Sequence, residues 1–510
     1  MLQNLILNID AGTIDWSRAQ FALTAIYHWL FVPLTLGLAV IMGIAETKYY
    51  QSKDAFWKET AKFWQKLFGI NFAMGVATGI ILEFEFGTNW SNYSWFVGDI
   101  FGAPLAVEGI VAFFMESTFV AVMYFGWKKV SPGFHLASTW LTGLGATISA
   151  WWILVANAWM QYPVGCEFNP DTMRNEMVSF AEVALSPFAI SKFCHTVTSS
   201  WIIGGIFCVG VCCWYLMKKR HTRLAVESIK IGAGVGLVAA LLAGATGHKS
   251  GMDVAEVQPM KLAAMEALYD GGTEQGLKII EGIEIPYGLS IMATNDPKGY
   301  VPGINNLLDG YTTPDGKTEP SADEKIERGK KAIQALAAYR KAKAEGAPNS
   351  IINSQLSIIN SNMKYFGYGY VKNKADLIPP VLVNFWAFRV MVGVGCLFIL
   401  FFAVILAVTY KFPKFLFNKY DITTLPAWHY WIAILLIPLA YIGSECGWLV
   451  AEFGRQPWTI QDMLPTWASV SDLQSSSVII TFFLFLVLFS TMLAVEINIL
   501  LKQIKKGPEL

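Results

Sequence analysis

The chain has 510 residues, of which 54% are hydrophobic and only 15% are charged, a composition typical of a membrane protein with several crossings. The 38 basic residues balance the 38 acidic residues, so the net charge gives no indication of a nucleic-acid or acidic partner. The seven cysteines lie mostly in apolar stretches without CxxC spacing, which argues against a zinc site or a disulfide framework.

Apolar runs recur along the chain, and each is close to the length of about 20 residues that a helix needs to cross a bilayer. They predict an all-α polytopic membrane protein. The nine expected transmembrane helices lie at residues 19–45, 67–87, 103–127, 136–160, 187–217, 224–247, 383–410, 428–453 and 478–501. An odd number of crossings places the two termini on opposite sides of the membrane.

The distribution of lysine and arginine predicts the orientation, because basic residues remain preferentially on the cytoplasmic side. The connections after the first, third, fifth and seventh helices and the C-terminal tail are basic, as at residues 218–220. The alternate short segments contain only Arg18, Arg174 and Arg455. The N-terminus is therefore expected outside and the C-terminus in the cytoplasm.

Two histidines lie within apolar sequence in the outer half of the predicted bundle. His28 is in TAIYHWLFVP of the first helix and His195 is in SKFCHTV of the fifth. Neutral imidazole is the commonest metal ligand, so each is a candidate ligand, with a hydrogen-bonded core histidine as the alternative. His248, at the outer end of the sixth helix, is a third candidate. The other histidines fall at inner helix ends and are expected to be ordinary interfacial residues: His135, His221 and His429.

Two carboxylates, Glu108 and Glu116, lie eight residues apart in the third helix. On an ideal helix they are about 12 Å apart along the axis and roughly 80° apart in projection. Because uncompensated carboxylates are costly inside a membrane, we interpret them as successive stations of a proton path. Glu83, in LEFEFG of the second helix, is a further acid that we expect to be buried, and its role stays open.

The connection of residues 249–382 is much longer and more polar than the others, and it is predicted to face outward. Ser321 and Glu324 have the spacing of a capping box, so a helix should begin there and end near Gly346. The chain is thus divided into helices one to six (1–248), this connection, and helices seven to nine (383–510).

Two polar residues of this connection, Lys261 and Glu266, are five residues apart in QPMKLAAMEALY. They would be about 140° apart around a helix, so no simple ion pair between them is expected. From the residues alone, a solvated helix face is the simplest interpretation.

Met391 begins the seventh helix in FRVMVG, two residues after Arg389. Methionine in a membrane helix usually serves packing. A His/Met pair is also a standard axial set of an electron-transfer haem, which makes His195 and Met391 candidates for one site.

The eighth helix ends in YIGSECGWLVAEFGRQPW, where Glu445, Trp448 and Glu452 share one helical face through i, i+3, i+7 spacing. A carboxylate at this depth requires a metal, a proton or a basic partner, and Glu445 is therefore a candidate ligand.

The glycine and proline of GRQPW are expected to end this helix, since Gly454 loosens the last turn and Pro457 disfavours helical geometry before it. Arg455 would then carry a fixed positive charge at the membrane surface, roughly 15 Å along the axis from Glu445.

GRQPW after an apolar helix, together with these histidines, carboxylates and Met391, resembles subunit I of the bacterial cytochrome bd quinol oxidases along the whole chain. The resemblance implies a terminal oxidase of the bacterial inner membrane that oxidises ubiquinol or menaquinol at the outer face and reduces dioxygen to water. It implies proton release outside and uptake from inside, so that charge crosses the membrane without a pump. It also implies two partners, a second membrane subunit (subunit II) and a very small single-helix subunit.

The same resemblance implies three haems. His195 and Met391 would ligate a low-spin haem b, with Arg389 close to it. His28 and Glu445, both catalytic, would each ligate one of two high-spin haems, a haem b and the chlorin haem d, in an order that the sequence leaves open. The residues implied to line the haem region are Asn157, Trp448 and Arg455.

For the proton route, the resemblance assigns catalytic roles to Glu108 and Glu116, with Ser117 and Ser149 as hydroxyls along the path. The residues that correspond to the quinol site of the family are Lys261 and Glu266. The second half of the long connection looks like the longer form of the family's quinol loop.

Three other functions stay open. The cyanide-insensitive branch of the same family shares the fold but carries haem b in place of haem d. A proton- or metal-coupled transporter would use Glu108, Glu116 and Glu445 as carriers, although no internal repeat is present. A haem-binding electron-transfer or assembly subunit without oxygen chemistry would have no need of His28 or Glu445.

Overall fold

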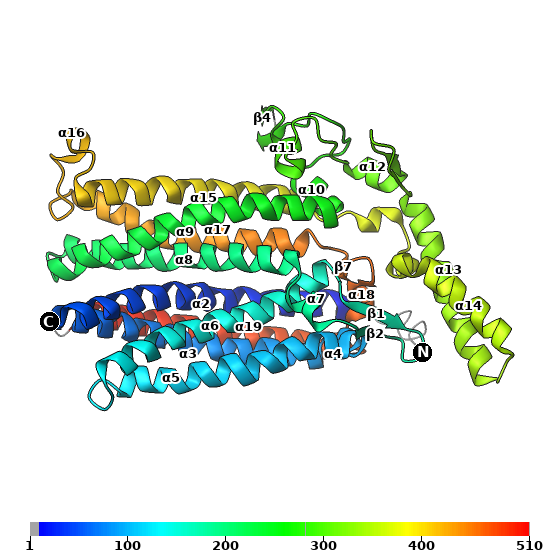
Figure 1. Cartoon of the computed structure of the whole chain (residues 1–510), viewed down its shortest axis with the longest axis horizontal. Helices are drawn as coiled ribbons and strands as arrows, with labels where there is room; N and C mark the ends of the chain where they lie inside the picture. The colour runs from blue at the N-terminus through cyan, green and yellow to red at the C-terminus, as the bar shows by residue number, and fades with distance from the viewer. Residues whose placement is uncertain (1–9, 281, 509–510) are drawn as a thin grey trace.

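The computed structural model describes residues 10–280 and 282–508, which form a long bundle of roughly parallel helices with a loop region beside one end (Figure 1). Within these ranges, nine helices are long and apolar enough to cross a membrane, and the all-α prediction is confirmed. The start of α2 and the end of α19 lie at opposite ends of the bundle, as an odd number of crossings requires (Figure 1).

Several crossings, such as those of α2 and α3, are longer than the predicted apolar spans because polar turns continue the helices beyond lipid length. Their bounds are α2 (Ala11–Ser52), α3 (Ala55–Thr88), α4 (Ser91–Val107) with η1 (Glu108–Phe113) and α5 (Phe114–Phe125), α6 (Pro132–Gln161), α7 (Phe180–Ala184) leading into α8 (Pro187–Met217), α9 (Thr222–Val257), α15 (Val381–Tyr410), α17 (Ala427–Phe453) and α19 (Ser475–Lys506).

Helix starts follow from local sequence. Ser131 accepts a hydrogen bond from the Phe134 amide and Pro132 occupies the first turn, so α6 begins there. Ser186 and Pro187 start α8 in the same way. Each of these capping serines satisfies one amide group at the start of its helix.

The third crossing is not a uniform α-helix. A π-helical turn, η1, begins at Glu108 and ends at Phe113, and α5 follows without a break. A π-helix has more residues per turn than an α-helix, so the ideal projection angle between Glu108 and Glu116 does not apply. Such turns are frequent at functional sites.

The connection between α9 and α15 is ordered around short elements, and α9 itself continues to Val257, beyond the predicted boundary at residue 248. Ser321 caps α13 by accepting from the Glu324 amide, and Gly346 follows the end of the helix in a left-handed conformation, as predicted. The elements of the connection are α10 (Pro259–Met265), β3 (Leu277–Ile280), β4 (Ile283–Ile285), α11 (Gly288–Thr294), α12 (Ile304–Asp309), β5 (Tyr311–Thr312), β6 (Thr318–Glu319), α13 (Ala322–Ala344), α14 (Asn349–Asn362), η2 (Met363–Tyr370) and η3 (Lys374–Leu377).

The strands form small antiparallel hairpins, β1–β2, β3–β4, β5–β6 and β7–β8. The remaining elements are β1 (Cys166–Asn169), β2 (Arg174–Met177), α16 (Lys414–Phe417), β7 (Trp458–Ile460), β8 (Leu464–Pro465) and α18 (Thr466–Ser469). The hairpin β7–β8 follows α17 directly and is buried on the loop side of the bundle.

The largest apolar core lies toward the end of the bundle where α2 ends and α3 begins, which we call the lysine-rich end. It contains large, fully buried side chains such as Trp64, Phe68 and Tyr215. The opposite end, beside the loop region, is the loop end. Packing is thus most continuous in the lysine-rich half, and the space for a site lies in the other half.

Candidate functional site

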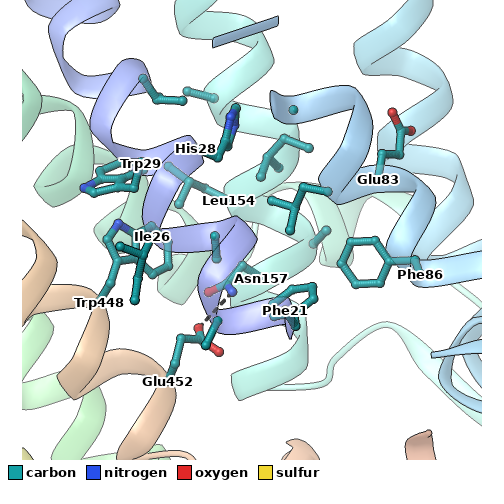
Figure 2. Close-up of a pocket in the computed structure, with 18 of the residues that line it drawn as sticks. Phe21, Ile26, His28, Trp29, Glu83, Phe86, Leu154, Asn157, Trp448 and Glu452 are labelled. Atoms are coloured by element: carbon teal, nitrogen blue, oxygen red, sulfur yellow. Dashed lines mark hydrogen bonds between the residues drawn. The ribbon is translucent and has the colours of Figure 1, made fainter. Parts of the chain in front are cut away.

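A cavity of about 790 Å³ opens between α2, α3, the third crossing, α6 and α17 in the loop half of the bundle (Figure 2). Its volume is in the range of ligand and cofactor sites. The residues singled out in the sequence that line it are His28, Glu83, Glu108, Glu116, Ser149, Asn157, Glu445, Trp448, Glu452 and Arg455. The fold therefore gathers residues from the first and the eighth crossings around one space.

His28 and Glu445 both face this cavity, from α2 and α17. The Nδ1 atom of His28 is 3.0 Å from Thr78 Oγ1. Glu445 Oε1 is buried and has no hydrogen-bond partner among the described residues. A buried carboxylate oxygen without a partner is costly, so this atom suits a cation or a metal in the cavity.

Trp448 lies one turn after Glu445 on the same wall, as the i, i+3 spacing predicts. Its ring is 5.0 Å from the ring of Trp29 in an edge-to-face contact, and the Trp29 indole N–H donates to Ser444 Oγ at 2.8 Å. The two aromatic rings form an apolar wall beside His28 (Figure 2).

Arg455 lines the cavity and is buried, with 6% of its surface exposed. Arg455 lies in the turn between the end of α17 and the buried strand β7, and its guanidinium pairs with Glu452 of α17. Its Nε and Nη1 groups are buried without a partner in the described part of the chain. An anionic group in the cavity would satisfy these donors.

A hydrogen-bond chain leads from this ion pair to the long connection. Asn157 Nδ2 donates to Glu452 Oε1 at 3.0 Å (Figure 2). Gln161 Nε2 donates to Asn157 Oδ1 at 2.9 Å, and Lys261 Nζ donates to Gln161 Oε1 at 2.7 Å. The lysine of the predicted quinol site is thus joined to the cavity wall through two amide side chains.

Lys261 is 2% exposed, so the interpretation as a solvated helix face is wrong for this residue. Burial, reinforced by the positive charge of Lys192, holds the pKa of Lys261 well below its usual value. A Cβ on Gly454 would lie 2.6 Å from Lys261 Cγ, so the glycine of GRQPW is required for the close approach of this side chain.

Glu266 is also buried, at 1% exposure, but it has a different partner. Arg389 Nη2 donates to Glu266 Oε2 at 2.6 Å and to the Lys278 carbonyl at 2.7 Å. Burial raises the pKa of Glu266 to about 7 and outweighs the opposing effect of Arg389. Lys261 and Glu266 form no ion pair with each other, as expected, and neither lines the large cavity.

His195 and Met391 lie outside this cavity, in the loop halves of α8 and α15. His195 Nδ1 is 3.2 Å from Thr246 Oγ1 of α9. A Cβ built on Gly447 of α17 would be 3.1 Å from Met391 Sδ. Because α9 and α17 each pack against both α8 and α15, the four helices can enclose a second site at this depth.

The predicted proton-route residues divide into two groups. Glu116 is buried against Gly145, and Ser149 Oγ donates to Glu108 Oε1 at 2.7 Å, so these residues lie at the cavity. Ser117 is exposed, and its hydroxyl donates to the Phe114 carbonyl of its own helix. Successive helical residues point about 100° apart, and in the packed bundle Glu116 lies on the buried side of the helix and Ser117 on the exposed side.

The buried acid of LEFEFG is Glu85, and the expectation for Glu83 is wrong. Glu83 is exposed at the cavity, whereas Glu85 is 2% exposed and accepts from Thr24 Oγ1 at 2.6 Å. Two acids two residues apart lie on different helix faces, and hydropathy does not distinguish which face packs inward.

A second buried polar cluster lies toward the lysine-rich end. His135 Nδ1 is 2.6 Å from Glu46 Oε1, and Glu46 Oε2 accepts from Thr139 Oγ1 at 2.6 Å and from Gln65 Nε2 at 2.9 Å. His135 is therefore buried, which corrects its prediction as an interfacial residue. Glu46 lies near the end of an apolar span, where a carboxylate gives no signal that separates it from a surface residue.

The described residues contain no group of three or more His, Cys, Asp or Glu side chains that could hold a bare metal ion. The third candidate ligand, His248, is exposed and lies 2.9 Å from Asn295 through Nε2. The residues at the cavity instead fit a large, partly anionic, metal-bearing group such as a haem. Glu445 offers a carboxylate oxygen and His28 an imidazole, and Arg455 offers donors without a partner among the described residues.

Comparisons with known proteins agree on one family. The family model described as "Cytochrome bd terminal oxidase subunit I" matches residues 16–508. Cytochrome bd-II ubiquinol oxidase subunit 1 of Escherichia coli (strain K12) is 39% identical over 513 residues, covering 97% of each chain. Cytochrome bd ubiquinol oxidase subunit 1 of Bacillus subtilis (strain 168) is 35% identical over 494 residues, covering 97% of this chain and 94% of that protein.

A solved structure has the same fold. The bd oxidase from Geobacillus thermodenitrificans superposes with a TM-score of 0.75 at 21% identity, covering 97% of this chain and 99% of the matching chain.

Proposed function

The chain belongs to the cytochrome bd terminal oxidase subunit I family and to the quinol oxidases, and we propose that it is the haem-bearing catalytic subunit of such an oxidase. It oxidises a membrane quinol at the loop end and reduces dioxygen to water. The observation that carries this proposal is that one cavity is lined by both His28 and Glu445, whose buried Oε1 atom has no partner among the described residues.

Three haems fit the chemistry of the available side chains. His28 and Glu445 would hold a high-spin haem b and a haem d, and His195 with Met391 would hold a low-spin haem b beside Arg389. Bound haem supplies the one-electron and dioxygen chemistry that side chains lack. The free Nε and Nη1 donors of Arg455 suit a propionate carboxylate.

At the loop end, Glu266 accepts the proton of a bound quinol. Burial lowers the pKa of Lys261, so this lysine loses its charge more readily than a surface lysine. The hydrogen bonds from Lys261 through Gln161 and Asn157 support a functional link between the quinol site and the cavity. Ubiquinol and menaquinol are both candidate donors.

Protons for water formation enter from the lysine-rich end, which the distribution of basic residues assigns to the cytoplasm. The Glu46–His135 cluster receives them, and buried or half-buried hydroxyls on one face of α6 lead onward to Glu116 and Glu108. The hydroxyls along this face are those of Thr139, Thr142 and Ser149. Uptake here and release at the loop end separate charge across the membrane without a pump.

The family implies a partner subunit II in a bacterial membrane, and we propose a very small single-helix subunit as a further component. The chain then lies in the inner membrane with its N-terminus outside and its C-terminus in the cytoplasm. This orientation follows the excess of basic residues at the lysine-rich end.

Replacing Glu116 with glutamine is expected to lower oxygen consumption on the order of 10²-fold, because the amide does not relay a proton. The haem spectrum should stay unchanged. Ser117→Ala is the matched control, since the neighbouring hydroxyl is exposed and bonds only its own helix. Oxygen consumption is measured with an oxygen electrode. Equal rates of oxygen consumption in Glu116→Gln and wild type would show that Glu116 is not part of the proton route.

Quinol oxidation should depend on pH through Glu266, whose pKa is about 7. Above this pH the carboxylate is ionised and accepts a proton, whereas below it the carboxyl is already protonated. We therefore expect kcat/KM for quinol to fall roughly tenfold per pH unit below 7. Glu266→Gln should remove this dependence, and Glu256→Gln, which changes an exposed acid, should retain it. An unaltered pH profile in Glu266→Gln excludes Glu266 as the acceptor.

A reduced-minus-oxidised optical spectrum of the purified complex, with pyridine haemochrome quantification, tests the function as a whole. Two b haems and one d haem are expected. B haems without a chlorin would favour the cyanide-insensitive branch of the family. A complex without haem would favour a transporter that uses the buried glutamates as proton carriers.

A further inference from the structure

The two histidines that we propose as haem ligands are held by the same pair of residues on a neighbouring helix. His28 of α2 lies against Thr78 and Gly79 of α3. His195 of α8 lies against Thr246 and Gly247 of α9. The same Thr-Gly pair thus meets a histidine ring in two different parts of the bundle.

The hydrogen bonds of the two threonines indicate which ring nitrogen carries the proton. Thr78 Oγ1 lies 3.0 Å from the Met74 carbonyl and 3.1 Å from the Gly75 carbonyl, so its single hydrogen is donated to its own helix. With its hydrogen assigned to the helix, this oxygen accepts a hydrogen bond from His28 Nδ1 at 3.0 Å. Nδ1 therefore carries the hydrogen, and Nε2 keeps a free lone pair.

The same count holds at the second pair. Thr246 Oγ1 lies 2.8 Å from the Leu242 carbonyl and 3.3 Å from the Ala243 carbonyl, and it faces His195 Nδ1 at 3.2 Å. His195 is therefore also protonated at Nδ1, with Nε2 available as a ligand.

The glycine of each pair gives the ring its space. A Cβ on Gly79 would lie 3.0 Å from His28 Cε1, and a Cβ on Gly247 would lie 3.2 Å from His195 Cε1. Both distances are tighter than ordinary contact, so a larger residue would push the ring out of its position. The threonine sets the tautomer and the glycine sets the ring plane.

A third histidine, which is buried, shows the contrast. His135 has Glu46 at Nδ1 and the Met123 carbonyl at Nε2, 3.1 Å away, so both of its nitrogens are engaged. It has no lone pair left for a metal, whereas the rings against the two Thr-Gly pairs each keep one.

We propose that Thr78 with Gly79 and Thr246 with Gly247 are positioning residues, which fix the Nδ1–H tautomer and the ring orientation of His28 and His195 for iron binding through Nε2. This inference rests on the proposed function, because it takes these two histidines as haem ligands. Groups that orient a metal-binding histidine through its other nitrogen commonly change metal affinity by about 10- to 100-fold when they are removed.

The test uses the purified complex and four variants, Thr78→Val, Thr78→Ser, Thr246→Val and Thr246→Ser. Valine removes the hydroxyl at nearly constant shape, and serine restores it. Haem content, the optical bands and the midpoint potential of each haem are measured. Thr246→Val should weaken or shift only the low-spin haem, and Thr78→Val only one high-spin haem, with serine close to wild type.

Each unaffected haem reports that the variant has folded. Thr409→Val is the matched control, because Thr409 donates to the Ile405 carbonyl in the same way and its hydroxyl is not bonded to a histidine. Wild-type haem content, bands and potentials in both valine variants would overturn the proposal, as would equal losses in the valine and serine variants. Full haem content in His28→Ala and His195→Ala would instead overturn the ligand assignment on which the proposal rests.

Discussion

Replacing Glu445 with alanine should remove one high-spin haem and lower oxygen consumption by at least ~100-fold. The carboxylate faces the cavity with a buried oxygen that has no partner among the described residues, and the haem iron is the partner that we propose for it. Alanine leaves no ligand at this position. Pyridine haemochrome quantification and an oxygen electrode measure the two effects on the same preparation.

Met391→Leu is the matched control for this variant, since it changes a proposed ligand of the other site at nearly constant volume. It should alter chiefly the low-spin haem and leave the high-spin pair in place. Retention of all three haems together with full turnover in Glu445→Ala would defeat the assignment of Glu445 as a ligand.

Replacing Arg389 with alanine should destabilise the protein by about 3–5 kcal/mol, because it leaves the Glu266 carboxyl buried without its charged partner. Arg389 and Glu266 side chains are only 10% and 1% exposed, so solvent screens their interaction little. Arg389 also donates to the carbonyl groups of Met265 and Lys278, and these acceptors would lose their donor. The expected result is a clear decrease in the thermal unfolding midpoint of the solubilised complex.

The double variant Arg389→Ala/Glu266→Ala should recover part of this loss, since it removes both members of the pair. Arg223→Ala is the control, because its ion pair with Asp54 is exposed and should leave the unfolding midpoint close to wild type. An Arg389→Ala protein with the wild-type midpoint would show that the pair does not hold the connection to α15.

Several features of this protein follow from local sequence. The membrane crossings can be predicted from the sequence because a helix of lipid length needs a continuous apolar run. The start of α13 can be predicted because its capping by Ser321 depends on residues within one turn. The shared face of Glu445, Trp448 and Glu452 follows from helical periodicity, and all three line the cavity.

Other features depend on contacts between distant segments. Hydropathy is similar for Glu83 and Glu85, and only the rotation of α3 against α2 makes Glu85 the buried acid. Likewise, His135 lies at a helix end in sequence, but Glu46 of α2 meets it in the packed bundle.

The residues themselves, His28, Glu445 and Arg455, were identifiable from the sequence by type and spacing. The tertiary structure decided that these residues meet around one cavity and that Arg455 is buried there. It also decided that the side chain of Lys261 passes close to Gly454. The physical reason is that apolar length and helical period are properties of neighbouring residues, whereas a cavity is formed by several helices whose rotation and depth are set by packing with one another.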